Sequence, residues 1–324
     1  MQTVRTQIRA FAPGDYAAYV DVTNRSYPEY GWTVEEVEHS DETWLKTPQF
    51  FRLRLVAEDE GRVVGAADAH HSRGSFNPTT YWLDVTVDPD RRGRGHGSAL
   101  YETALAALRE RGARTVRASA KESMTDGVRF LERRGFSEAK RDWESRLYLK
   151  NFDFERFAAA PERVRAAGIR IATLADLVAE DARAVEKAFE LFEDTRKDVP
   201  SLDPATAMDI ALFRAQDVEG PNALPDAFFI AIDGDRWVGL SNMFRSLEDP
   251  SFIWQGLTAV RRDARGRGIA MALKLETVQY ARKLGVEHIK TWNDTRNRPM
   301  LAINEAMGFV KQPVWIQFQK ELGG

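Results

Sequence analysis

The 324-residue sequence contains no cysteine. Disulfides, thiolate metal sites and a cysteinyl-acyl intermediate are therefore excluded, so any acyl transfer should pass directly from a thioester to its acceptor. The chain also lacks any run of about 18 apolar residues, the length that a membrane-spanning helix needs. Its first residues contain no apolar core of the kind that a signal peptide requires. We therefore expect a cytoplasmic protein with no membrane partner and no metal.

An excess of charge of one sign is also lacking. The chain has 46 Lys and Arg against 49 Asp and Glu, and its formal net charge is −3. This balance gives no general attraction to nucleic acid or to acidic membranes, so basic clusters are local features. Apolar residues make up 43% of the chain. Its length and apolar content suit two ordinary domains, each with its own core.

One stretch of the chain occurs twice. Residues Val85–Gly112 read VTVDPDRRGRGHGSALYETALAALRERG, and residues Thr258–Gly285 read TAVRRDARGRGIAMALKLETVQYARKLG. Arg92 and Arg265 lie 173 residues apart, and the later Gly-Phe pairs keep the same offset. A repeat that holds its register this long indicates two copies of one fold.

Each copy runs from an apolar strand, through a turn rich in glycine and arginine, directly into a helical pattern. Glycine permits unusual backbone angles there, and the first turn of a helix leaves N–H groups unpaired. The arginines at positions 91, 92, 94, 261, 262, 265 and 267 add positive charge. A ligand with adjacent phosphates is therefore the natural occupant. The alternative is a tight turn with a solvated basic face, which two copies in register disfavour.

Two common phosphate motifs do not fit. Neither copy has the Gly-Lys-Ser/Thr of a Walker A loop, and Gly93, Gly95 and Gly97 have the wrong spacing for a dinucleotide-binding loop. What fits is Arg-x-x-Gly-x-Gly/Ala, which resembles the pyrophosphate-binding loop of the GCN5-related N-acetyltransferases (GNAT). The matching positions are Arg92, Gly95 and Gly97 in the first copy and Arg265, Gly268 and Ala270 in the second.

The expected order of elements also resembles that family. Each copy reads as a strand and helices, a hairpin, a strand entering the loop, the loop helix, a strand, a helix and a closing strand. The closing strands are expected at Ser145–Leu149 and Trp315–Phe318. We predict an α/β fold of two tandem GNAT domains, residues 1–152 and 168–324, with a connector at 153–167. Each would be a mixed, mostly antiparallel sheet flanked by helices, similar to tandem-domain acetyltransferases with the architecture of mycothiol synthase.

The resemblance implies transfer of an acetyl group from acetyl-coenzyme A to a primary amine of a small molecule or peptide, by direct attack in a ternary complex. It also implies that backbone N–H groups near Val87 and Val260 bind the thioester carbonyl and stabilise charge that develops on it. The implied coenzyme contacts in the loops and helix starts are Arg92, Gly93, Arg94, Gly95, His96, Gly97, Ser98, Arg265, Gly266, Arg267, Gly268, Ile269 and Ala270.

The sequence departs from the family at the catalytic acid. Many members carry a tyrosine five residues before the Phe of the Gly-Phe pair, but these positions hold Leu131 and Asn304. Asparagine can form a hydrogen bond with a sulfur but is not an acid, and leucine can do neither. Asn304 is therefore a candidate for both catalysis and coenzyme contact. Asn297 either contacts the coenzyme or caps a helix.

The attacking amine must first lose a proton, because a free alkylammonium has a pKa of about 10. A base or a water relay is therefore needed. In the first copy the candidates are Tyr81 and Asp84 on the strand that enters the loop, and His70 or His71 on the preceding strand. For His96, a phosphate contact and a solvent-exposed position are both open.

Substrate specificity is expected from the variable segments before each hairpin, at residues 26–38 and 193–200. Several alternatives stay open at this point. Only one of the two copies could be active, or the chain could be an acyl-coenzyme A sensor that binds without catalysis, which the missing acid favours. A factor associated with nucleic acid is disfavoured by the net acidity. A monomer and a homodimer both fit the sequence.

Overall fold

The computed structural model describes residues 6–323 and divides the chain into two compact units. Unit 1 consists of Met1–Arg141 together with Trp315–Gly324, and unit 2 of Asp142–Val314. Each unit is built on a mixed, mostly antiparallel β-sheet with helices on both faces, which confirms the predicted fold class. Within the described residues, no helix has both the length and the apolar composition needed to span a bilayer.

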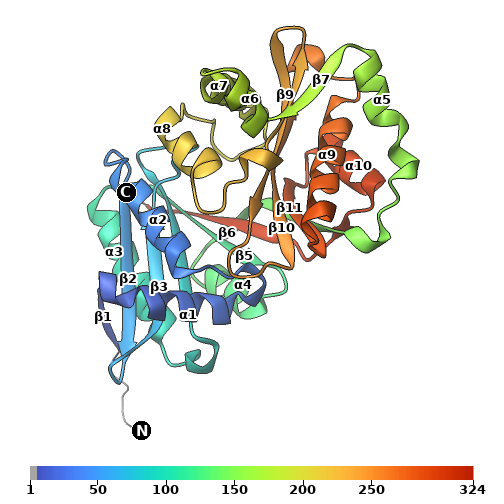
Figure 1. The fold of residues 1–324 in the computed structure, drawn as a ribbon. Helices are drawn as coiled ribbons and strands as arrows, with labels where there is room; N and C mark the ends of the chain where they lie inside the picture. Colours follow the sequence, from blue (N-terminus) through green and yellow to red (C-terminus); the bar gives the residue numbers. More distant parts are fainter. Residues whose placement is uncertain (1–5, 324) are drawn as a thin grey trace. The chain divides into compact units, whose positions relative to one another are not determined.

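The sheet of unit 1 has the order β1-β2-β3-β4-β5-β13. Its strands are β1 (Gln7–Ala10), β2 (Arg52–Asp59), β3 (Arg62–His70), β4 (Thr80–Val87), β5 (Thr115–Lys121) and β13 (Trp315–Glu321). Its helices are α1 (Tyr16–Ser26), α2 (Val34–Leu45), α3 (His96–Glu110) and α4 (Thr125–Glu132). The pair β4 and β5 is parallel, and the other pairs that form this sheet are antiparallel. Helices α1 and α2 lie on one face and α3 on the other (Figure 1).

The sheet of unit 2 repeats this order as β7-β8-β9-β10-β11-β6. Its strands are β7 (Ile169–Thr173), β8 (Phe229–Asp233), β9 (Arg236–Arg245), β10 (Phe252–Val260), β11 (His288–Asp294) and residues 142–148 of β6 (Ser137–Tyr148), with the short β12 (Val310–Lys311) also paired to β6. Its helices are α5 (Ala159–Ala166), α6 (Leu174–Glu180), α7 (Ala184–Arg196), α8 (Ile210–Phe213), α9 (Ile269–Leu284) and α10 (Arg298–Met307).

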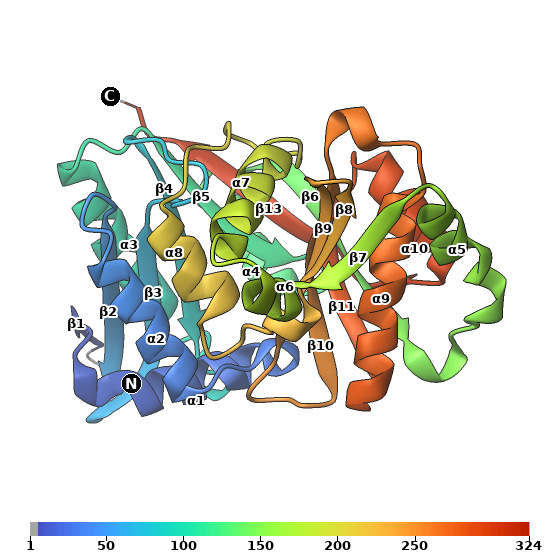
Figure 2. The ribbon, with the colours of Figure 1, turned by 45° about the horizontal axis from the view of Figure 1, so that its top comes forward.

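Two apolar clusters hold unit 2 together, one on each face of its sheet. One cluster joins α5 and α9 to the sheet, and the other joins α6 and α7 to the opposite face (Figure 2). The helical spacing of the sequence explains these contacts: in α9, Ala272, Leu273, Leu275 and Val278 are all buried, as expected for an apolar stripe that recurs every three or four residues.

The closing strands are exchanged between the two halves of the sequence. The strand expected to close the first copy, Ser145–Leu149, lies in β6 and its following turn, and β6 pairs with β11 of unit 2 from Asp142 to Tyr148. The strand expected to close the second copy is β13, which pairs with β5 of unit 1 over seven residues (Figure 2). The compact units therefore differ from the expected ranges 1–152 and 168–324. Alternation of side chains identifies a strand but not its distant partner.

Candidate functional site

In both units a pair of parallel strands opens into a V. Within the described residues, β4 and β5 pair only from Thr80 to Trp82, and β10 and β11 pair only from Phe252 to Trp254. Beyond these positions each pair diverges, and the glycine-arginine loop follows at the end of β4 or β10. The same opening therefore precedes the same loop twice.

The register of each sheet directs backbone groups into this opening. The N–H of Asp88, just after β4, donates to the carbonyl of Val64 in β3, at 2.9 Å. Because hydrogen bonding alternates along an antiparallel pair, the N–H and C=O of Val87 point the other way, toward the V. In unit 2 the N–H of Arg261 donates to the carbonyl of Val238 in β9, at 2.8 Å. By the same alternation, the N–H of Val260 also points toward its V.

The arginine that opens each motif fastens the loop to the end of the strand. Arg92 Nε donates to the carbonyl of Val87 at 3.1 Å, and Arg265 Nε donates to the carbonyl of Val260 at 2.9 Å. This contact uses only the Nε of each guanidinium. The remaining nitrogens lie beside the loop, where an anionic ligand would be attracted.

The glycines of the two loops are required for conformation rather than for space. Gly93, Gly95, Gly266 and Gly268 all have positive φ, between 76° and 94°, a region that other residues rarely adopt. Gly95 and Gly268 are the N-cap residues of α3 and α9, and neither helix start carries a side-chain cap. The first bond of α3 is donated by Ala99 to Gly95, at 3.0 Å. The N–H groups before it suit the oxygens of a diphosphate.

The arginines of the unit 2 loop lie beside acidic side chains. In unit 2, every arginine of the loop has an acidic partner: Arg261 pairs with Asp194, Arg262 and Arg265 with Asp198, and Arg267 with Asp233. Hydrogen bonds from Arg262, and then from Arg265, lower the pKa of Asp198 below its ordinary value despite some burial.

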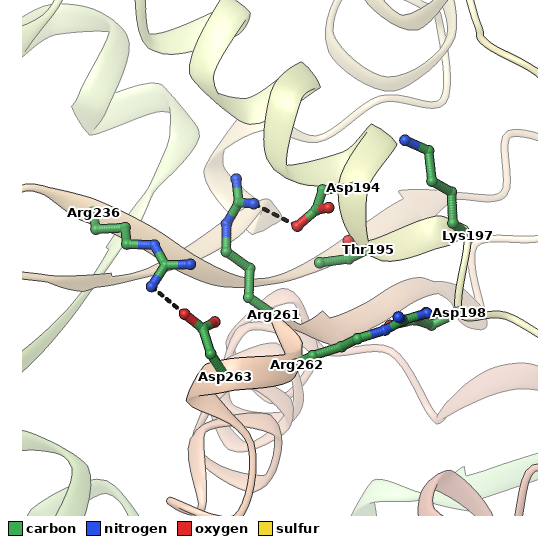
Figure 3. Close-up of a pocket in the computed structure, with 8 residues that line it drawn as sticks. All are labelled: Asp194, Thr195, Lys197, Asp198, Arg236, Arg261, Arg262 and Asp263. Carbon is green, nitrogen blue, oxygen red and sulfur yellow. Dashed lines mark hydrogen bonds and ion pairs between the residues drawn. The ribbon is translucent and has the colours of Figure 1, made fainter.

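These groups line an open pocket beside the loop of unit 2 (Figure 3). Its lining residues are Asp194, Thr195, Lys197, Asp198, Arg236, Arg261, Arg262 and Asp263. Asp194 and Asp198 come from the end of α7 and the turn after it, so a segment outside the repeat supplies two of the three acidic residues that line the pocket. An anion that binds this loop must compete with these carboxylates.

The loop of unit 1 has an additional cation that the motif does not contain. Arg134, from the turn after α4, donates from its Nη2 to Ser98 Oγ at 2.7 Å, and its guanidinium lies over the ring of Phe130 at 3.5 Å. Arg134 thus adds positive charge to the first turn of α3, whereas the position 173 residues later is Met307. In the sequence, this difference shows only as arginine at position 134 and methionine at position 307.

His96 occupies neither of the two positions considered for it. The side chain is buried, its Nδ1 lies 2.8 Å from Thr6 Oγ1, and its Nε2 lies 3.6 Å from Asp59 Oδ2. Burial lowers its pKa, although the nearby carboxylate of Asp59 opposes this shift. Only the backbone N–H of His96 is therefore left for a phosphate. Ile269, at the corresponding helix start in unit 2, is also buried, so only its backbone N–H can contribute.

Tyr81 does not face the opening. Its ring is buried and stacked on His71 with ring centroids 4.3 Å apart, and its hydroxyl donates to the carbonyl of Pro78. His71 is equally structural, because its Nδ1 accepts a hydrogen bond from the N–H of Phe51 at 3.0 Å. Side chains alternate across a strand, and Tyr81 lies on the opposite face of β4 from Asp84. The burial of Tyr81 and the hydrogen bond of its hydroxyl both count against a role as the base.

Asp84 and His70 form a pair on the α1 and α2 side of the unit 1 sheet. His70 Nε2 lies 3.7 Å from Asp84 Oδ2, and the carboxylate of Asp84 is half exposed. Burial opposes protonation of His70, but the interaction with the Asp84 carboxylate and the negative charge of Asp68 outweigh the effect of burial. The pKa of His70 is therefore raised. Of the base candidates named for the first copy, Asp84 has the most exposed side chain, whereas Tyr81 and His71 are buried.

The two asparagines of α10 have different surroundings. Asn297 caps the helix, since its Oδ1 accepts from the N–H of Met300 at 3.4 Å. Asn304 is buried and its Nδ2 donates to Asn293 Oδ1 at 2.7 Å. The Oδ1 of Asn304 has no hydrogen-bond partner within the described residues. A buried acceptor of this kind suits a ligand that brings an N–H group.

Residues 17–136 and 188–309 both match the family model described as the Acetyltransferase (GNAT) family. Among similar proteins, the mycothiol acetyltransferase of Thermobispora bispora is 35% identical over 140 residues, which cover 40% of this chain and 46% of that protein. That of Geodermatophilus obscurus is 34% identical over 140 residues, with 40% and 44% coverage. The matched region thus spans less than half of these relatives. The mycothiol acetyltransferase of Nocardia farcinica is 25% identical over 272 residues, covering 82% of this chain and 81% of that protein.

Solved structures share the fold over almost the whole chain. A tandem GNAT protein from the clavulanic acid biosynthesis pathway has a TM-score of 0.74 and 20% identity, and the match covers 99% of both chains. A GCN5-related N-acetyltransferase from Sphaerobacter thermophilus has a TM-score of 0.65 and 20% identity, with 98% of this chain and 95% of that one covered. At this level of identity the likeness concerns the fold alone.

Proposed function

Because this chain belongs to the acetyltransferase (GNAT) family, we propose that it transfers an acetyl group from acetyl-coenzyme A to a primary amine of a small molecule or peptide. The amine attacks the thioester directly in a ternary complex, since the chain has no cysteine to carry the acetyl group. The observation that carries this proposal is the repeated opening between two parallel strands, which leads to an uncapped helix start.

Each part of the opening has a proposed role. The N–H groups at the starts of α3 and α9 hold the diphosphate of the coenzyme, and Arg92 and Arg265 add charge beside it. The N–H groups of Val87 and Val260 point into the V, where they stabilise negative charge on the carbonyl oxygen of the thioester. Asn304 Oδ1 accepts a hydrogen bond from an amide N–H of the coenzyme. The coenzyme itself supplies the activated acetyl group.

Charge reversal in each loop tests whether both units bind the coenzyme. We expect calorimetry to show two coenzyme A molecules per unmutated chain and one in Arg92→Glu or Arg265→Glu, because the new carboxylate repels the diphosphate. A panel of alkylamines, assayed for release of the free thiol from acetyl-coenzyme A, tests catalysis. Arg156→Glu, which reverses the charge of an arginine outside both loop sequences, is the matched control. A chain that binds no coenzyme, or binds it without acetylating any amine, contradicts the proposal.

The acidic partner of the unit 2 loop gives a second prediction. In Asp198→Asn, Arg262 and Arg265 lose their carboxylate, and we expect coenzyme A to bind unit 2 roughly 3- to 10-fold more tightly, in line with the modest worth of exposed ion pairs. The measurement is calorimetry in the Arg92→Glu background, which isolates unit 2. Glu248→Gln, which removes a charge at the turn between β9 and β10, serves as the control. Unchanged or weaker binding in Asp198→Asn would count against competition by this carboxylate.

A further inference from the structure

Unit 2 contains a β-bulge that unit 1 lacks. The register between β9 and β10 shifts between Gln255 and Thr258, so Gly256 and Leu257 lie opposite Asn242 alone. The corresponding pair in unit 1, β3 and β4, keeps one continuous register. A bulge bends its strand and changes the direction of nearby groups, and bulges are frequent beside active sites.

Asn242 packs directly against this bulge. A Cβ atom at Gly256 would overlap Asn242 Oδ1 and would lie 2.7 Å from the ring of Phe244, so only glycine allows the amide to lie this close. Asn242 is buried, and its Oδ1 has no hydrogen-bond partner within the described residues. An unpaired buried acceptor therefore lies at the bulge, where a donor from a ligand would satisfy it.

The side-chain amide of Asn242 also contacts a buried carboxylate, that of Asp217. Asn242 Nδ2 donates to Asp217 Oδ1 at 3.1 Å. Asp217 belongs to the single turn of π-helix at Arg214–Val218, a conformation that is often found at functional sites. It forms no ion pair within the described residues. Arg214, on the same turn, pairs instead with Glu186 and Glu219.

Burial gives Asp217 the acid-base properties of a proton acceptor at neutral pH. Loss of solvent raises its pKa to about 7, and the hydrogen bond from Asn242 opposes only part of this shift. Among the described residues, no charged side chain contributes to this rise in the pKa of Asp217. A carboxylate with this pKa is a far better base than an exposed aspartate, because a general base acts best when its pKa lies near the working pH.

We infer that Asp217 and Asn242 form the amine end of the acceptor site in unit 2, with Asp217 as the general base and Asn242 Oδ1 as the acceptor that orients the nitrogen. The inference rests on the proposed acetyl transfer and extends it by assigning the base. The substrate class is a primary alkylamine that arrives as its ammonium form. The site faces away from α9, on the side of the sheet that α6 and α7 cover.

The proton and electron balance of the step is simple. One proton moves from the ammonium nitrogen to the Asp217 carboxylate, which frees a lone pair on the nitrogen. The nitrogen forms a bond to the carbonyl carbon of the thioester, the C–S bond breaks, and its electron pair leaves on the sulfur. A second proton from the nitrogen ends on that sulfur and gives the free thiol. Asp217 then returns its proton to water.

Asp217→Asn tests this assignment with two kinds of amine. For the alkylamine that the unmutated chain acetylates fastest, we expect kcat/KM to fall by at least about 100-fold, within the range usual for a lost general base. For hydroxylamine, whose nitrogen is already unprotonated at neutral pH, we expect a fall of less than about 3-fold, since no base is needed. In Asp217→Asn, kcat/KM for the alkylamine should no longer show the decline that ionisation of Asp217 causes as the pH falls below neutrality. The affinity for coenzyme A should not change. Glu219→Gln, two residues away and exposed, is the matched control.

The outcomes separate this inference from the function on which it rests. If Asp217→Asn retains the alkylamine activity and its decline below neutral pH, or loses activity equally with both amines, Asp217 is not the base. Loss of activity in Asp84→Asn but not in Asp217→Asn would place the base in unit 1 and also overturn the inference. If the unmutated chain acetylates no amine at all, the proposed function fails first and the inference falls with it.

Discussion

Replacing Asp217 by asparagine will make the protein more stable in neutral and alkaline solution. The folded state raises the pKa of this carboxyl from 3.8 to about 7. The folded chain therefore binds a proton more tightly than the unfolded chain, and ionisation of Asp217 costs stability as the pH rises from 3.8 through 7. Asparagine has no such ionisation. Because a tenfold change in proton affinity corresponds to about 1.4 kcal/mol, we expect a gain on the order of 2 to 4 kcal/mol at about pH 8.

The measurement is the free energy of unfolding of unit 2 from chemical denaturation across the pH range. The difference between Asp217→Asn and the unmutated chain should be small near the ordinary pKa of an aspartate and should reach its plateau above about pH 7. Glu219→Gln should show no such rise. A difference that is flat with pH would mean that Asp217 is not held in a desolvated site. A residue that costs stability where it lies, and whose removal costs activity, is typical of catalytic groups.

Removal of residues 315–324 will unfold unit 1 while unit 2 stays folded. This deletion takes away all of β13, including the buried side chains of Ile316 and Phe318. Loss of large buried side chains costs about 2 to 5 kcal/mol each, and a whole domain is stable by only about 5 to 15 kcal/mol. Thermal unfolding followed by calorimetry should therefore lose one of two transitions. Deletion of Gly323 and Gly324 alone should leave both transitions in place.

A pair of fragments sharpens the test of the exchanged strands. Residues 1–152, the range that the sequence predicts as a domain, should not unfold cooperatively, because β5 lacks its partner. Residues 1–141 joined by a short glycine-serine linker to residues 315–324 should fold, because this fragment restores that pairing. If fragment 1–152 unfolds as cooperatively as the joined fragment, the exchange of strands is not needed for stability.

Local features of the site could be predicted from the sequence, and distant ones could not. The glycines at positions 93, 95, 266 and 268 mark the turn because positive φ is required there, and this requirement depends only on neighbouring residues. The exchange of β6 and β13 depends on pairings across most of the chain length, for which the alternation of side chains gives no signal. The 173-residue offset suggested two self-contained copies, in which each closing strand pairs within its own half of the sequence.

The candidate base of unit 2 was missed for a related reason. Asp217 lies outside residues 193–200, the segment from which substrate specificity was expected in the second copy, so the sequence drew no attention to it. Its significance comes from burial and from Asn242, a residue 25 positions further along that the sheet brings beside it. In the first copy, alternation alone could have separated Tyr81 from Asp84, because neighbouring positions at odd spacing on β4 face opposite sides.

The exchanged strands also have a consequence for synthesis of the protein. When the ribosome has made the first half of the chain, β5 exposes an edge whose partner has not yet been translated. An exposed edge of this kind is a template for pairing with other chains. Unit 2 can complete its own sheet earlier, because β6 precedes it in translation. Although most of unit 1 is translated first, its sheet is thus the last to be completed.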